Sequence, residues 1–353
     1  MEPTIASPSP SLPLTPEAIA SWRDQGFALV HGVFPDEIID AAKEEMRQTP
    51  PGRLGQGLQF PSTSDALNRI STHPRLRAAA AQLLGTSRLT LLQSEAWSKS
   101  SPGMLTSATT LLGLNPMTAY SNNDQRMHMD YPNHYLTHPS PWSNPDGVEA
   151  ILYFDDYETC GGATRAVPRA GDDDEAYSWP YLAMPGVGGH AWLNDKSATE
   201  KYFEKAAPEM ARFRQRLYER EVELRYRAGT ILLYRFDTWH RGSPLRRGAP
   251  ARRVLNLVVA KEEATWITPW NCRLRLPKAD EEVSEVAILN AGPHHGFSRM
   301  MYFGAEEELD RMTVKRKCAL GVPPPDAKWY WTSEMREAVR TRFPRGDWAS
   351  FVR

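Results

Sequence analysis

The chain has few cysteines, no long apolar run and almost no net charge. Its three cysteines, Cys160, Cys272 and Cys318, are scattered and form no Cys-x-x-Cys pair, which favours free thiols in a reducing compartment. No stretch approaches the roughly 18 apolar residues of a membrane-spanning helix. A formal net charge of −1 gives no general electrostatic reason to bind nucleic acid or an anionic membrane. We therefore expect a cytoplasmic protein whose partner is a small molecule.

The composition allows a substantial core in one large domain or two small ones. Of the 353 residues, 41% are hydrophobic, as in ordinary globular proteins. Residues 1–14, which are rich in proline and serine, predict a disordered tail without the pattern of a secretory signal. We expect residues 15–262 to form the core. Residues 263–353 are predicted to be a C-terminal extension packed on that core.

Hydrophobic periodicity predicts a mainly β protein with flanking helices. Thr15 and Pro16 are typical of the first residues of a helix. Short apolar runs separated by glycine, proline and asparagine favour a double-sheet, cupin-like jelly roll with helices on its outer face. The expected helices cover 15–25, 36–48, 73–85 and about 199–219, and the expected strands cover 27–34, 88–92, 149–154, 222–226, 230–236 and 253–259.

Three residues have the character of a metal site. His128 and Asp130 lie two positions apart in RMHMD, and His240 lies in DTWHRGSP. Side chains at i and i+2 of a strand share one face, so the first two can converge on one ion. Two histidines and one carboxylate suit Fe(II) and leave coordination positions open. The alternatives are a structural His–Asp hydrogen bond with an unrelated surface histidine, or zinc, whose structural sites favour cysteine.

A second candidate feature follows the distal histidine. Arg252 begins an apolar run, where a guanidinium can bind a dicarboxylate through paired, charge-assisted hydrogen bonds. Arg252 and Arg253 point to opposite faces of a strand. We prefer Arg252 and leave Arg253 open. Ser243 and Thr164 are further candidates for the same ligand, although Thr164 is equally typical of an ordinary strand.

Several segments, in order along the chain, resemble the phytanoyl-CoA dioxygenase-like family of Fe(II)/2-oxoglutarate oxygenases. They are LTPEAIASWRDQGFALVHGVFPDEIIDAAKEEM, HMD, YFDDYETCGGATRAVPRAG and AGTILLYRFDTWHRGSP followed by RRVLNL, and together they cover roughly residues 14–262. One departure is HRGS, where the family often has His-Gly-Ser.

The resemblance implies a double-stranded β-helix oxygenase core with Fe(II), 2-oxoglutarate as cosubstrate and O2. It assigns His128, Asp130 and His240 to the metal and Arg252 to 2-oxoglutarate. The implied reaction is hydroxylation or a related oxidation of an unactivated C–H bond, with release of succinate and CO2. Related halogenases usually lack the carboxylate, so the presence of Asp130 favours hydroxylation.

The substrate is the least determined part of the prediction. The loop after the metal motif offers Tyr131, His134, Tyr135 and Trp142 as substrate contacts, or else forms an ordinary surface loop. Arginines near the motifs indicate either an anionic substrate or a solvated rim. Other hypotheses are a catalytically silent binding or scaffold protein on the same fold, and a metal-dependent hydrolase or isomerase. The oligomeric state, monomer or dimer, stays open.

Overall fold

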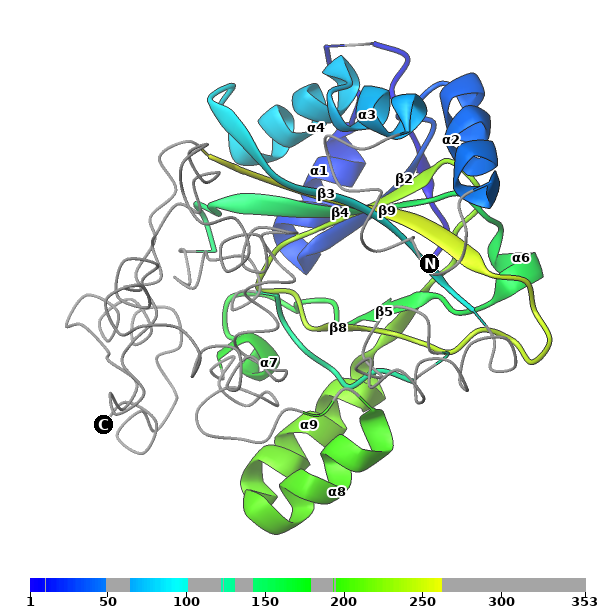
Figure 1. Cartoon of the computed structure of the whole chain (residues 1–353). Helices are drawn as coiled ribbons and strands as arrows, with labels where there is room; N and C mark the ends of the chain where they lie inside the picture. The colour runs from blue at the N-terminus through cyan, green and yellow to red at the C-terminus, as the bar shows by residue number, and fades with distance from the viewer. Residues whose placement is uncertain are drawn as a thin grey trace, which may run out of the picture.

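Two mostly antiparallel sheets face each other in the computed structural model, which describes residues 1–9, 11–48, 64–100, 122, 124–130, 142–178, 193 and 195–261. The larger sheet has six strands in the order β1-β2-β7-β4-β9-β3, and the smaller has three in the order β6-β5-β8. Figure 1 shows helices α1–α4 on the outer side of the larger sheet and the smaller sheet on its other side. The expected jelly-roll architecture is confirmed. The predicted extension, 263–353, lies outside the described residues.

The larger sheet has one apolar face under the helices and one mixed face toward the smaller sheet. Alternate residues of each strand divide between these faces. Leu255 and Leu257 pack in the cluster under the helices, whereas Val254 packs with residues of both sheets. The strands are β2 (Phe27–His31), β3 (Leu89–Lys99), β4 (Gly147–Tyr153), β7 (Thr230–Tyr234) and β9 (Arg252–Lys261).

Three of the four helices on the outer face lie where the sequence predicted them, and the fourth, α3, was not predicted. Thr15 caps the first helix by accepting the backbone N–H of Ala18, and Gly26 ends it with a φ of 97°, which glycine adopts readily. The apolar sides of the four helices lie in the same buried cluster as the outer face of the larger sheet. The helices are α1 (Pro16–Gln25), α2 (Asp36–Gln48), α3 (Asp65–Ser71) and α4 (Pro74–Leu84).

The first residues differ from the expected disordered tail. Thr4–Ile5 forms β1, which pairs in parallel with β2. Arg75 donates to the backbone carbonyls of Ser7 and Ser9, and Leu14 is buried. Composition alone could not predict this ordered structure, because the partners of residues 1–9 are the edge of the sheet and an arginine far along the chain.

The smaller sheet carries a helical hairpin on its outer side. Its strands are β5 (Thr164–Ala166), β6 (Val222–Leu224) and β8 (His240–Gly242), and the hairpin consists of α8 (Lys196–Ala206) and α9 (Pro208–Arg220). The single helix expected over about 199–219 is wrong, because Pro208 favours an extended conformation at Ala207 and cannot supply a helical N–H. Two short helices, α6 (Tyr157–Cys160) and α7 (Glu175–Ser178), lie in connections.

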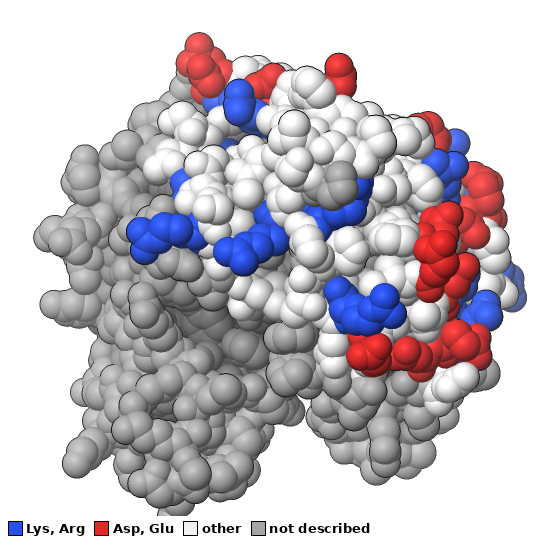
Figure 2. Space-filling view, turned by 90° about the horizontal axis from the view of Figure 1, so that it is seen from above, with Lys and Arg blue, Asp and Glu red and all other residues white. Residues whose placement is uncertain are grey.

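The surface bears both signs of charge. On the face seen from above, Figure 2 shows basic side chains in a broken row across the middle and acidic side chains along the top edge and the right-hand side. Such mixed charge on the described part of this face agrees with the small net charge of the chain. Within the described ranges, no helix combines the length and apolar character needed to cross a membrane.

Candidate metal centre

The three predicted metal ligands come together between the two sheets. His128 and Asp130 lie on the segment 124–130, and His240 begins β8. His128 and His240 form an isolated antiparallel bridge, with backbone N–H to O distances of 2.9 and 2.8 Å. This pairing joins residues 112 positions apart in the chain, which explains why sequence spacing alone did not establish their proximity.

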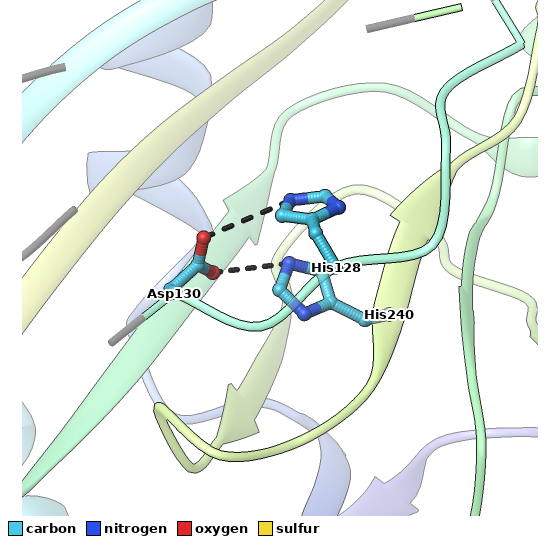
Figure 3. Close-up of side chains that lie close together, drawn as sticks. All are labelled: His128, Asp130 and His240. Carbon is cyan, nitrogen blue, oxygen red and sulfur yellow. Dashed lines mark ion pairs between the residues drawn. The ribbon is translucent and has the colours of Figure 1, made fainter. Parts of the chain in front are cut away.

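The ligand atoms are close enough to share one ion. His240 Nε2 lies 3.0 Å from Asp130 Oδ2, and His128 Nε2 lies 3.7 Å from Asp130 Oδ1. One ligand atom from each of the three residues lies within 4.8 Å of the other two. Figure 3 shows both imidazoles turned toward the carboxylate. All three residues are buried, so the geometry fits a single metal ion shielded from solvent.

A backbone carbonyl fixes the orientation of each imidazole by accepting a hydrogen bond from its Nδ1 atom. His128 Nδ1 lies 3.0 Å from Arg126 O, and His240 Nδ1 lies 3.0 Å from Thr238 O. Each Nδ1 therefore donates its proton to a carbonyl. This bond fixes the tautomer that leaves Nε2 free to bind a metal.

The two histidines differ in proton affinity because their neighbouring charged groups differ. Burial, together with the charges of His240 and Arg126, holds the pKa of His128 well below its usual value. Burial also lowers the pKa of His240, but the charge and hydrogen bond of Asp130 outweigh it, so this pKa is raised overall. Without metal, the negative charge of Asp130 thus favours a proton in the hydrogen bond between His240 Nε2 and Asp130 Oδ2. A metal cation would take the place of that proton.

Two residues that the sequence analysis did not single out lie against Asp130. Tyr234 donates its hydroxyl to Asp130 Oδ2 at 3.2 Å. Glu149, its partner in the β4–β7 register, is buried, and burial and the charge of Asp130 raise its pKa well above the usual value. A charged residue inside the otherwise apolar strand GVEAILY was the available signal for Glu149.

The structure separates the two candidate arginines. Arg252 is 4% exposed on the inner face, donates through Nη1 to Gly162 O and lies 5.8 Å from the ring of Tyr153. Its Nε has no hydrogen-bond partner among the described residues. Arg253 lies on the opposite face, where its guanidinium and backbone N–H bind Asp155 at 3.0 and 2.7 Å. Of the two, only Arg252 is directed toward the interior between the sheets.

A buried lysine that the sequence analysis missed accompanies Arg252. Lys99 is the register partner of Arg252, is 4% exposed and donates to Ser243 O at 2.7 Å. Burial, followed by the charge of Arg252, holds the pKa of Lys99 well below its usual value. The sequence offered little indication that Lys99 faces this interior, because the predicted strand ended at residue 92, whereas β3 continues to Lys99.

The remaining candidates have other described contacts or lie outside the described residues. The Ser243 hydroxyl donates to Ala163 O at 2.6 Å, and Thr164 Oγ1 lies 2.7 Å from the Tyr153 hydroxyl. Trp142 donates its indole N–H to Arg23 O. Tyr131, His134 and Tyr135 lie outside the described residues. For all of them, ligand binding stays a prediction.

A jelly roll with a buried site of two histidines and one carboxylate is typical of the class of non-haem metal oxygenases. The family model of phytanoyl-CoA dioxygenase matches residues 22–254, and the chain belongs to this family. Its expected cofactors, Fe(II), 2-oxoglutarate and O2, are those that the His–Asp–His site fits. No curated protein matches the chain.

Several solved structures resemble the chain at low identity. The alpha ketoglutarate dependent epimerase SnoN from nogalamycin biosynthesis is 18% identical, with a TM-score of 0.42 over 69% of this chain and 81% of that one. HygX from Streptomyces hygroscopicus, with nickel and 2-oxoglutarate bound, is 14% identical, with a TM-score of 0.44 over 72% and 89%. EctD from S. alaskensis is 12% identical, with a TM-score of 0.48 over 75% and 82%. These values assign no particular reaction to the chain.

Proposed function

We propose that the protein is an Fe(II)- and 2-oxoglutarate-dependent dioxygenase that hydroxylates, or otherwise oxidises, a C–H bond of a small organic substrate and releases succinate and CO2. The observation that carries the proposal is the combination of a buried His–Asp–His site with a buried arginine that has no carboxylate partner among the described residues. The first fits the metal, and the second indicates an anionic ligand in the same interior.

Arg252 and Lys99 support a dicarboxylate as that ligand. A buried cation is costly unless an anion compensates it, and Arg252 has an Nε without a hydrogen-bond partner among the described residues. A carboxylate between Arg252 and Lys99 would accept hydrogen bonds from both and would raise the depressed pKa of Lys99. The ammonium group of Lys99 binds the carbonyl of Ser243. Ser243 lies three residues after His240, and three residues of extended chain span about 10 Å. A five-carbon diacid and the arginine side chain together cover this span.

The residues of the chain would prepare the site before any reaction occurs. His128 and His240 present Nε2 because their Nδ1 protons are held by carbonyls, and Tyr234 holds one oxygen of Asp130. Arg252 and Lys99 would orient the cosubstrate by its distal carboxylate. When bound, Fe(II) supplies the activation of O2 that is coupled to oxidative decarboxylation of 2-oxoglutarate. Burial of these groups excludes bulk water, which protects reactive species.

The substrate itself is proposed only as a small organic molecule. Of the predicted contacts, Trp142 is the one within the described residues, and its ring packs against Arg235 at 3.8 Å and Arg169 at 4.3 Å. A role for these arginines in holding an anionic substrate stays a prediction.

Anaerobic titration tests the proposal without knowledge of the substrate. Fe(II) should bind with one-to-one stoichiometry, and addition of 2-oxoglutarate should produce a visible metal-to-ligand charge-transfer band. On admission of O2, slow release of succinate should follow even without substrate. His128→Ala and Asp130→Ala should remove the band and the succinate. If the wild-type protein binds Fe(II) but gives neither band nor succinate with 2-oxoglutarate, the proposed function is wrong.

A further inference from the structure

The segment that carries His128 and Asp130 is an irregular edge of the smaller sheet. It meets β8 and the turn before β8 at three residues, through Gln125 N to Gly242 O, the His128–His240 pair, and Asp130 N to Phe236 O. In antiparallel pairing, the residue between two such contacts directs its N–H and C=O away from the partner strand. For Met127 no strand lies on that side among the described residues, apart from the single bridge between Gln125 and Asp195.

Side chains of the α8–α9 hairpin, and not a neighbouring strand, bind the backbone N–H and C=O of Met127. Tyr218 Oη accepts the N–H of Met127 at 3.0 Å, and Arg214 Nη2 donates to Met127 O at 3.1 Å. The carboxylate of Glu200 joins these two side chains. It accepts Arg214 Nε at 3.1 Å, Arg214 Nη2 at 2.9 Å and the Tyr218 hydroxyl at 2.7 Å. Both backbone groups of Met127 are thereby satisfied.

We propose that Arg214, Tyr218 and Glu200 are positioning residues that set the place of His128 at the metal by holding the backbone of Met127. The proposal rests on the proposed metal site, and it concerns the hairpin and not the ligands themselves. Arg214 is fully buried, and its guanidinium lies 5.0 Å from the ring centre of Phe203. A buried, paired guanidinium has little freedom to move, so it transmits the position of the hairpin to residue 127.

The same hairpin holds the strand of the other histidine. Glu221, directly after α9, accepts Arg241 Nε and Nη2 at 2.6 Å each. Arg241 follows His240 in β8 and is also buried. Residues adjacent to both metal-binding histidines are therefore fixed to α9 or its end. Figure 1 shows the hairpin on the side of β8 away from the larger sheet.

Position matters here because metal affinity and reactivity depend on small displacements of the ligands. Loss of groups that orient metal ligands typically weakens metal binding about 10- to 100-fold. A purely structural role for Arg214 would instead lower the stability of the fold and leave the ligands of the folded protein unchanged. Metal affinity and ligand geometry, measured on folded protein, distinguish the two roles.

The matched control is another arginine–carboxylate pair on the same helix. Arg220 binds both oxygens of Asp174 at 2.7 and 2.6 Å, and within the described part of the chain it makes no hydrogen bond or ion pair with residues 124–130 or with His240. Arg220→Met therefore removes a comparable ion pair from α9 without touching the segment that carries the metal ligands. Tyr218→Phe is the mildest test variant, because it keeps the ring and removes only the hydroxyl that holds Met127.

The experiment titrates Co(II) into the wild type, Arg214→Met, Tyr218→Phe and Arg220→Met, and records affinity, the ligand-field absorption spectrum and urea stability. We expect the two test variants to bind Co(II) about 10- to 100-fold more weakly with an altered spectrum. Arg220→Met should lose stability, with affinity within twofold of the wild type and an unchanged spectrum. If Arg214→Met does not fold, Tyr218→Phe decides.

Two results overturn the inference. The first is wild-type affinity and an unchanged spectrum in folded Tyr218→Phe, and the second is an equal loss of affinity in Arg220→Met. Failure of the wild-type protein itself to bind Co(II) would instead count against the proposed metal site. The failure of the inference and that of the proposed function are thus distinguishable.

Discussion

Replacement of Arg252 by methionine should weaken the binding of 2-oxoglutarate roughly 100-fold while leaving the fold intact. In the structure the guanidinium is buried, donates to Gly162 O and has an Nε without a partner in the part of the chain that the structure describes. A buried, charge-assisted pair with a ligand carboxylate is worth about 2–5 kcal/mol when one partner is truncated. A value of about 3 kcal/mol corresponds to roughly 100-fold weaker binding.

The effect on stability should be small because two contributions oppose each other. Arg252→Met loses one hydrogen bond, worth about 1 kcal/mol. It also removes a buried cation that has no carboxylate partner within the described ranges. The repulsion between this cation and Lys99, whose pKa is lowered first by burial and then by Arg252, is lost as well. We expect the free energy of unfolding, without ligand, to stay within about 1 kcal/mol of the wild type.

The neighbouring residue provides the control with the opposite pattern. Arg253→Met breaks the pair with Asp155, which keeps Lys43 at 3.5 Å and the Arg253 backbone N–H. The expected loss of stability is about 2 kcal/mol, with unchanged affinity for 2-oxoglutarate. Calorimetric titration of 2-oxoglutarate into the Co(II)-loaded variants and urea unfolding of the metal-free variants measure both quantities. Tight binding by Arg252→Met together with weak binding by Arg253→Met would refute our assignment of the two faces.

Three further predictions concern other buried contacts. Lys99→Met should weaken 2-oxoglutarate binding about 10-fold or more at neutral pH. Because the pKa of Lys99 is depressed, wild-type affinity should fall as pH rises through that pKa, and titrations at several pH values should find this dependence lost in Lys99→Met. The pKa of Asp174 is lowered overall, since the hydrogen bonds from Arg220 and the backbone outweigh burial. The contribution of the ionised Asp174 to the free energy of unfolding should therefore be present above the unfolded pKa of about 3.9 and be lost as pH falls through the lower folded value. Urea unfolding at several acidic pH values should show a smaller loss of stability in Asp174→Asn than in the wild type. Gly147→Ala should cost about 1–3 kcal/mol in urea unfolding, because a Cβ would lie 2.6 Å from the Phe236 ring; wild-type stability would contradict the packing described.

The sequence predicted well those elements whose signals are local. Thr15, Pro16 and Gly26 specify both ends of α1 through capping and a positive φ. The i, i+2 spacing of His128 and Asp130 indicated a shared face, and the structure brings both to His240. In each case the physical cause acts within a few residues.

Other features depend on tertiary partners and were missed. β3 was predicted to end at residue 92 but extends to Lys99, because its second half has polar residues on the inner face, where a purely apolar pattern was expected. The neighbourhood of Lys99 and Arg252 arises from the pairing of β3 with β9, which no local pattern encodes. The choice between Arg252 and Arg253 likewise required knowledge of which face the helices cover.

The charged residues of the inner face are the places where the sequence departs from the pattern of an ordinary sandwich. Lys99, Arg252 and Glu149 each occupy inward positions that apolar side chains would fill in a sheet selected for stability alone. Arg253, on the outer face, is instead neutralised by Asp155. Departures of this kind concentrate at functional sites. Here they divide by sign, with the two cations beside each other in the β3–β9 register and the acid against the proposed metal ligand Asp130. An elongated dianion entering this interior would therefore direct its distal carboxylate to the cations and its other end to the metal.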